Sequence, residues 1–189
     1  YADAHDGTEV IALTVAPESA AATVRKALAM GADRAIQVTD EGLRGADVML
    51  TAEALAAAVR SEGFDLVIGG NAATDGMSGM VPTAAAEHLG VPVLTGLSGV
   101  EISESAVAGT RPVEGGVQRV SAPLPAVVSI TEALPDGRFP SFKGIMAAKK
   151  KPLHALSLTD LDVMADAEAV SRSIMLSISE RLLPVAAPL

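Results

Sequence analysis

Short runs of apolar, β-branched residues alternate along this chain with Ala-rich segments of helical periodicity. This alternation limits the possible folds more than any other feature of the sequence. Residues 9–15, 35–38 and 65–68 are such runs, and a segment of helical type follows each of them. Strands that alternate with helices are typical of a parallel sheet covered by helices on both faces. We therefore predict an α/β fold with a doubly wound, mostly parallel sheet.

The predicted helices have recognisable ends. The first helix is expected over residues 19–30, because Ser19 can cap its start and a glycine follows its end. The second is expected over residues 51–61 with Thr51 as its cap. A third covers residues 83–89. These helices would link successive strands of the sheet.

The second half of the chain has a different pattern. Residues 99–120 alternate between apolar and polar side chains around Gly turns, which predicts a β-rich section of antiparallel strands, and residues 124–130 form one more buried strand. Residues 152–189 lose this periodicity, apart from a short helix expected near residues 166–171. We predict a nucleotide-binding α/β domain over residues 1–151 and an extended C-terminal arm over 152–189 that packs on a partner subunit.

Composition excludes several classes of function. The chain has 189 residues and no Cys, which rules out disulfides, thiolate catalysis and Cys-held metal clusters. Aromatic residues make up 2% and the net charge is -9, so we expect no nucleic-acid binding. No apolar run is long enough to span a membrane, and the acidic start is unlike a signal peptide, so we expect no membrane insertion. A bacterial cytoplasmic location follows, or the mitochondrial matrix if the source is eukaryotic.

The Gly-rich loop, residues 69–79 (GGNAATDGMSG), lies directly between a predicted strand and a predicted helix. Ligands of open α/β sheets bind beyond the carboxyl ends of strands, where backbone N–H groups can hold a phosphate. The loop matches neither the P-loop spacing nor the dinucleotide fingerprint. Both a nucleotide site and an ordinary Gly-rich loop remain open. Val15 ends a neighbouring strand and would lie at the same edge.

The hook segment, residues 138–151 (RFPSFKGIMAAKKK), holds two of the three Phe residues and ends in three Lys residues. An exposed apolar group beside basic residues is a good docking element. The alternative is a helix whose Phe and Ile side chains face the core and whose Lys side chains are solvated. Residues alone leave both interpretations open.

Catalytic and metal-binding patterns are weak. His5, His88 and His154 are widely spaced and lack the helical spacing of metal ligands. The G-x-S-x-G motif of serine hydrolases does not occur. We expect no metal and no covalent catalysis by this chain.

The Gly-rich loop and the hook segment, together with residues 27–34 (ALAMGADR) and 124–128 (LPAVV), resemble the β subunit of electron transfer flavoprotein in order and spacing. Residues 144–151 (GIMAAKKK) resemble that family's recognition loop for dehydrogenases. The resemblance implies a non-enzymatic electron-carrier subunit of an αβ heterodimer. The α subunit would hold most of the FAD, and the β subunit would hold AMP, or a second FAD in bifurcating relatives. Electrons would pass from flavin dehydrogenases, such as those for acyl-CoA in fatty acid oxidation, to a quinone reductase.

The resemblance also assigns roles to individual residues. The family's domain begins with a further strand that would lie upstream of Tyr1, so we expect the chain to lack the N-terminal part of that domain. The nucleotide would contact the end of one strand and the Gly-rich loop, at Val15, Gly70, Asn71, Ala72, Ala73, Thr74, Asp75, Gly76, Met77, Ser78 and Gly79. Phe142 occupies the position of the apolar anchor. The partner-docking residues would be Phe142, Gly144, Ile145, Met146, Lys149, Lys150 and Lys151.

Two other functions fit the Gly-rich loop without a partner. One is a stand-alone adenine-nucleotide sensor of the universal-stress type, which would bind ATP as an isolated chain. The other is a nucleotide α-hydrolase, for which the sequence offers no phosphate-activating group. The apolar arm over residues 152–189 favours the heterodimer, because a monomeric sensor has no use for it.

Overall fold

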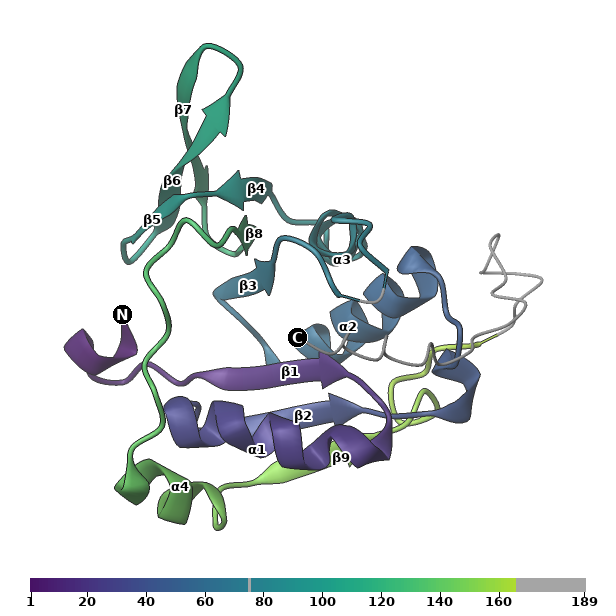
Figure 1. Ribbon diagram of the computed structural model, residues 1–189. Helices are drawn as coiled ribbons and strands as arrows, with labels where there is room; N and C mark the ends of the chain where they lie inside the picture. The colour runs from purple at the N-terminus through teal and green to yellow at the C-terminus, as the bar shows by residue number, and fades with distance from the viewer. Residues whose placement is uncertain (75, 166–189) are drawn as a thin grey trace, which may run out of the picture.

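The structure is a computed structural model that describes residues 1–74 and 76–165. Strands and helices alternate through the first half of the chain, and strands predominate after α3 (Figure 1). The principal elements are β1 (Ile11–Val15), α1 (Ala21–Met30), β2 (Arg34–Val38), α2 (Val48–Glu62), β3 (Leu66–Gly70), α3 (Val81–Leu89), β4 (Val93–Leu97), β5 (Gly99–Ile102), β6 (Ala106–Val113), β7 (Gly116–Pro123), β8 (Ala126–Ile130), α4 (Phe142–Ala148) and β9 (Leu153–Leu156). Short 3-10 turns cover Ala2–Ala4, Glu18–Ala20 and Glu41–Leu43.

In the part of the chain that the structure describes, the strands form three sheets of three strands each. Two of these sheets are parallel, with strand orders β1-β2-β9 and β3-β8-β4, and the third is antiparallel, with order β5-β6-β7. The predicted α/β fold with a β-rich section is therefore confirmed. Within the described residues no ladder joins β1 to β3, so the parallel strands form two sheets rather than one.

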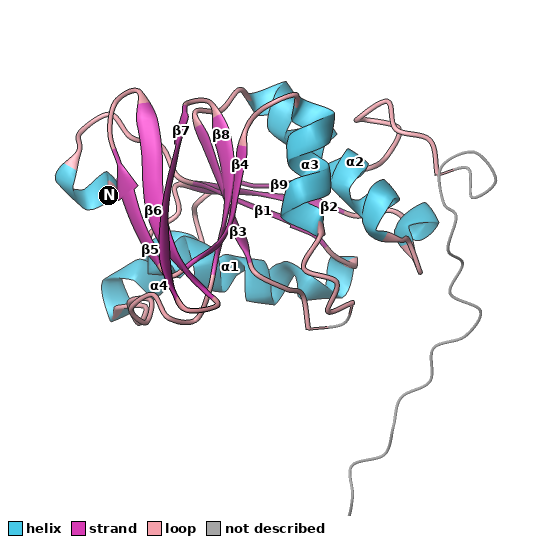
Figure 2. Cartoon of the chain, turned by 90° about the horizontal axis from the view of Figure 1, so that it is seen from above, coloured by secondary structure: helices cyan, strands magenta, loops and turns pink. Residues whose placement is uncertain are grey.

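Helices cover both faces of the β1-β2-β9 sheet. Successive side chains of a strand point to opposite faces, so neighbouring residues of β2 pack against different helices. Ile36 and Val38 of β2 pack in one cluster with Leu50 of α2. Ala35, the residue before Ile36, points to the opposite face and packs with Leu28 of α1 in a second cluster. This is the doubly wound arrangement that the apolar runs predict. Figure 2 shows α1 and α2 separated by the strands.

The antiparallel sheet closes the core on the other side of the molecule. Leu97 of β4 and Val128 of β8 form a buried cluster with Val107 of β6 and Ala122 of β7. The hairpin of β6 and β7 extends beyond this cluster and projects from the top of the molecule in Figure 1. Only its base contributes to the core, since every residue from 112 to 119 is exposed.

Helix α2 begins one turn earlier than predicted. The predicted cap, Thr51, lies inside the helix, and Asp47 is the cap instead: its carboxylate accepts hydrogen bonds from the N–H groups of Met49 and Leu50, each at 3.0 Å. Asp and Thr are both favoured caps. The apolar residues between them, 48–50, can occupy a first helical turn, so the predicted start at residue 51 is wrong.

The first residues of the predicted arm belong to a sheet. Leu153–Leu156 form β9, which pairs in parallel with β2 at the edge of its sheet. Leu158 and Val163 are also buried, in the cluster beside α2. The short helix predicted near residues 166–171 lies outside the described residues.

Candidate functional site

The Gly-rich loop joins the carboxyl end of β3 to the start of α3 (Figure 1). Met80 is the N-cap residue of α3, and its side chain makes no capping hydrogen bond. The first N–H groups of a helix lack partners within the helix, and together with the helix dipole they favour an anion. This end of α3 has the chemistry of a phosphate site.

Open space lies beside the backbone of the Gly-rich loop. At Gly70 and at Gly76, a Cβ atom would meet no other heavy atom within 4 Å. Two later residues have left-handed backbone, with φ of 52° at Met77 and 65° at Gly79, and the N–H of Met77 donates to the carbonyl oxygen of Ala73 at 2.9 Å. The loop thus turns compactly and leaves room for a ligand to approach its glycines.

The other residues assigned to the nucleotide lie at the same surface. Side chains along the loop are exposed, as expected for groups that meet a ligand, but Asp75 lies outside the described residues. Those exposed are Asn71, Ala72, Ala73, Thr74, Met77 and Ser78. Ser78 also accepts a hydrogen bond from the N–H of Met80 at 3.3 Å, so its hydroxyl orients the helix start.

Val15 is half-buried at the carboxyl end of β1, and β1 and β3 point in the same direction in Figure 1. Gln37 of β2 fixes the backbone segment that follows β1. Its side-chain amide, 3% exposed, donates to the carbonyl oxygens of Pro17 at 2.6 Å and Ala16 at 3.4 Å. Gln37 is not among the site residues predicted from the sequence. A polar residue inside an apolar run is the signal that could have identified it.

An apolar recess of about 420 Å³ lies elsewhere, lined by Tyr1, Ile68, Val100, Ile102, Ile130 and Leu134. It includes no residue of the predicted nucleotide site. The nucleotide assignment therefore rests on the open backbone of the Gly-rich loop and on the start of α3, not on this recess.

The hook segment contains α4, and its large apolar side chains point into solvent. Phe139 is 92% exposed and Phe142 is 81% exposed, while Ile145 and Met146 are 44% and 49% exposed. The residue that α4 buries is Ala148, which packs against α1. The alternative in which Phe and Ile face the core is therefore wrong. Exposed apolar patches are typical of binding surfaces.

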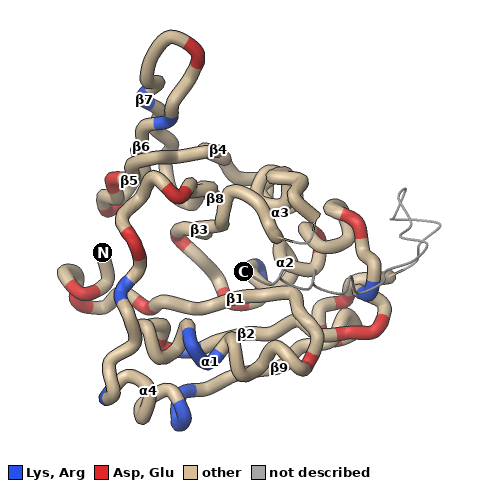
Figure 3. Tube along the Cα trace, viewed as in Figure 1, with Lys and Arg blue, Asp and Glu red and all other residues tan. Residues whose placement is uncertain are grey.

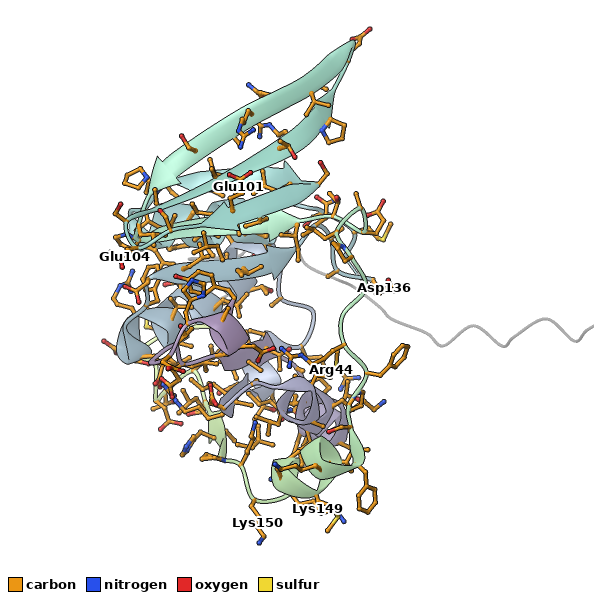
Figure 4. All side chains as sticks on the ribbon, turned by 90° about the vertical axis from the view of Figure 1, so that its left-hand side faces the viewer. Arg44, Glu101, Glu104, Asp136, Lys149 and Lys150 are labelled. Atoms are coloured by element: carbon orange, nitrogen blue, oxygen red, sulfur yellow. The ribbon has the colours of Figure 1, made fainter. Side chains whose placement is uncertain are left out.

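Charge is distributed unevenly around this patch. The hook segment contains five basic residues and no acidic one, although the chain as a whole carries a net charge of -9. Figure 3 shows the basic positions at α4 and acidic positions over much of the remaining trace. In Figure 4, Lys149 and Lys150 extend from the end of the molecule opposite Glu101 and Glu104. The patch thus combines apolar anchors with local positive charge.

Two residues assigned to docking have contacts inside the chain. Lys151 is half-buried, and its Nζ donates to the carbonyl oxygens of Ala32 at 2.5 Å and Leu28 at 3.3 Å. Gly144 faces α1 so closely that a Cβ atom there would overlap the carbonyl oxygen of Ala29. The other docking residues, Phe142, Ile145, Met146, Lys149 and Lys150, are exposed.

No cluster of three or more His, Asp or Glu side chains that could hold a metal ion occurs in the described part of the chain. Among the helices of residues 1–74 and 76–165, none is long and apolar enough to cross a membrane.

The architecture is that of a Rossmann-like α/β protein with a β-rich section. Residues 1–161 match the family model described as the electron transfer flavoprotein domain. The chain is 48% identical to the electron transfer flavoprotein subunit beta of Mycobacterium tuberculosis over 167 residues, which cover 87% of this chain and 63% of that protein. It is 40% identical to the protein of the same name from Bacillus subtilis over 182 residues, which cover 95% of this chain and 68% of the relative.

A third relative is the Caffeyl-CoA reductase-Etf complex subunit CarD of Acetobacterium woodii, 33% identical over 172 residues, 90% of this chain and 66% of that protein. These matches confirm the resemblance seen in the Gly-rich loop and the hook segment. The chain belongs to the electron transfer flavoprotein family. It spans less than two thirds of the length of the Mycobacterium protein that it matches.

Proposed function

We propose that this chain is the β subunit of an electron transfer flavoprotein, a non-enzymatic carrier that pairs with an α subunit. The family match and the relatives named as subunit beta support this assignment. FAD, held mainly by the α subunit, would supply the electron-transfer chemistry. The contribution of this chain would be to bind a nucleotide, hold the complex together and present a docking surface.

The observation that carries the proposal is the exposure of Phe142, at the start of α4, and of Phe139, just before that helix, in the basic hook segment. A large apolar side chain that enters a pocket on a partner supplies much of the affinity of an interface, while charges around it raise the rate of association. We propose that Phe142 is the apolar anchor for flavin dehydrogenases, such as those that act on acyl-CoA. Lys149 and Lys150 would steer acidic partner surfaces toward it. A quinone reductase would accept the electrons.

The Gly-rich loop is proposed to bind AMP. Backbone N–H groups at the start of α3 and in the loop would hold the phosphate, and Val15 would contact the adenosine. The open space at Gly70 and Gly76 supports this role, because a phosphate can approach the backbone there. A cytoplasmic site of action is proposed, in line with the bacterial relatives.

The first test is the native composition of the purified protein. The untagged chain is purified from its source, its small molecules are released by denaturation, and all masses are measured. We expect FAD, AMP and a second, larger chain. A single chain that carries ATP, with no flavin and no partner, would support the universal-stress type of sensor instead.

The second test addresses the anchor. Phe142→Ala should weaken docking to a flavin dehydrogenase by about 2 kcal/mol or more, roughly 30-fold in Kd. The matched control is Val117→Ala, which truncates an aliphatic side chain that is 71% exposed on the β6–β7 hairpin. An affinity that is equal in the Phe142 variant and the unmodified protein would remove the anchor assignment.

A further inference from the structure

Near the carboxyl ends of α1 and α4, basic side chains donate hydrogen bonds from one helix region to backbone carbonyl groups of the other. Lys151, three residues beyond α4, reaches the carboxyl end of α1, where its Nζ donates to the carbonyl oxygens of Ala32 and Leu28 at 2.5 and 3.3 Å. In the opposite direction, Arg25 of α1 donates from Nη1 to the carbonyl oxygens of Ala148 at 2.8 Å and Lys151 at 3.3 Å. Arg25 of α1 thus places a cation at the carboxyl end of α4, and Lys151, just beyond α4, places one at the carboxyl end of α1.

These contacts have a physical basis in the helix ends. The last carbonyl groups of a helix lack partners within the helix and carry the negative end of its dipole. A basic side chain satisfies both their hydrogen-bonding and their electrostatic needs. Arg25 and Lys151 are both half-buried, so these hydrogen bonds are partly shielded from water. These hydrogen bonds therefore hold α4 against α1 more firmly than fully solvent-exposed hydrogen bonds would.

The apolar contact between the two helices is small. Ala148 is the one α4 residue classed as buried, and it lies against Val24 and Leu28 of α1. Gly144 permits the close approach of the two backbones. Since Phe142, Ile145 and Met146 of the same helix point into solvent, little apolar burial fixes the orientation of α4. Hydrogen bonds from Arg25 and Lys151 must supply much of that constraint.

We propose that Arg25 and Lys151 are positioning residues that hold the hook segment in its docking orientation. This inference rests on the proposed docking function. It divides the three consecutive lysines by role: Lys149 and Lys150 extend into solvent and act on the partner through charge, whereas Lys151 acts within the chain. Loss of Lys151 loosens α4, and loss of Lys149 or Lys150 leaves α4 in place.

The first measurement needs no partner. Trypsin cuts after Lys143, which lies within α4, only when that helix opens, so the cleavage rate reports the open population. We compare Lys151→Met with Lys149→Met and Lys150→Met, which remove the same charge from neighbouring positions. Lys151→Met should raise the rate of cleavage after Lys143 about tenfold, because it removes charge-assisted hydrogen bonds. The two control variants should leave this rate unchanged, and Lys151→Arg should restore slow cleavage.

The second measurement is the salt dependence of docking to a flavin dehydrogenase. Lys149→Met and Lys150→Met should weaken docking mainly at low salt and reduce its salt dependence, because they remove solvent-exposed charges. Lys151→Met should weaken docking about tenfold at every salt concentration. For Lys151→Met, docking affinity should depend on salt concentration as steeply as in the unmodified protein, since the charge of Lys151 does not face the partner.

Two results for Lys151→Met would overturn the proposal. One is an unchanged rate of cleavage after Lys143. The other is a salt dependence of docking that falls as much as in Lys149→Met and Lys150→Met. If no form of the protein docks to a dehydrogenase, the proposed function fails, while the cleavage assay still decides the role of Lys151 in holding α4. Should Lys151→Met fail to fold, Arg25→Met removes the donors from the other side. We expect the same accelerated cleavage after Lys143 from that variant.

Discussion

The side-chain amide of Gln37 donates a hydrogen bond of 2.6 Å to the carbonyl oxygen of Pro17. This contact joins the interior of the β1-β2-β9 sheet to the segment that follows β1. Gln37 is 3% exposed, and it is one of only two buried polar residues in the described part of the chain. A buried polar side chain is stable only when it is hydrogen-bonded. Gln37 therefore fixes the path of the backbone next to Val15.

Gln37→Leu should lower the free energy of unfolding by about 1 to 3 kcal/mol, because the carbonyl groups of Ala16 and Pro17 lose their donor. Urea denaturation followed by circular dichroism measures the change. Gln118→Leu is the control. Gln118 is an exposed strand residue that accepts a hydrogen bond from Nε of Arg111 at 2.8 Å, and because water can replace this exposed acceptor, the substitution should alter the free energy of unfolding by less than about 0.5 kcal/mol. Equal stability of the Gln37 variant and the unmodified protein would contradict the anchoring role.

Gly70→Val tests the nucleotide site by filling the space in front of the loop. Since a Cβ atom at Gly70 meets nothing within 4 Å, the free energy of unfolding should change little. Affinity for AMP should fall about tenfold or more, because branched carbons replace the open approach to the backbone. Isothermal titration calorimetry of the native complex, stripped of nucleotide, measures this loss. Gly116→Val on β7, where a Cβ atom also meets open space, should bind AMP normally.

Gly144→Ala distinguishes helix propensity from close packing. Propensity alone predicts a gain of about 1 kcal/mol when Ala replaces Gly inside a helix. The overlap of the new Cβ atom with the carbonyl oxygen of Ala29 predicts instead a loss of about 1 to 3 kcal/mol. We expect the loss, visible as a lower urea midpoint. A stabilised variant would mean that α4 does not pack closely on α1.

Acid should weaken the ion pair between Glu9 and Arg34, whose Oε1 and Nε atoms are 2.7 Å apart. The hydrogen bond from Arg34 holds the pKa of Glu9 below its usual value. The carboxyl is therefore more acidic in the folded protein than in the unfolded chain, where its pKa is about 4.3. Its contribution to stability is present above that pH and is lost as the pH falls through the lowered folded value.

Thermal unfolding of Glu9→Gln tests this sign. The Tm of the variant should lie slightly below that of the unmodified protein at pH 7, since exposed ion pairs contribute little. The difference should shrink as the pH falls below about 4.3 and vanish once the pH is below the lowered folded pKa of Glu9, because the carboxyl is then protonated in both states. Glu104→Gln is the control at another exposed glutamate. A difference in Tm for Glu9→Gln that persists unchanged in acid would contradict the ion-pair explanation.

Strands β1, β2, β3 and β8 were predictable because their local sequence patterns match buried strands of a parallel sheet. The apolar run before residue 15 is a strand, and the glycine at position 31 ends α1 as predicted, with φ of 134°. The start of α2 was less certain, because Asp47 and Thr51 are both good caps and only the tertiary structure selects one. Local patterns thus specify elements better than they specify ends.

Long-range contacts explain the remaining differences. Residues 153–156 (LHAL) form a short run without a β-branched residue, which does not predict a strand, yet they pair with β2. Their pairing depends on residues more than one hundred positions earlier. The roles of Arg25 and Lys151 were hidden for the same reason, because no sequence pattern shows that two helix ends meet. The candidate docking surface was visible from its composition, but the exposure of Phe142 required the structure.

The pairing of β9 with β2 also affects the order in which the protein can fold during synthesis. Ile36 lies opposite His154 in this ladder, so the sheet built from the earliest strands gains its last strand only after the β3-β8-β4 and β5-β6-β7 sheets have been synthesised. Contacts between positions so distant in sequence form slowly, because a long loop must close first. The hook segment lies between β8 and β9, at the end of that loop. A nascent chain would therefore gain a fixed docking surface only late, when most of its core already exists.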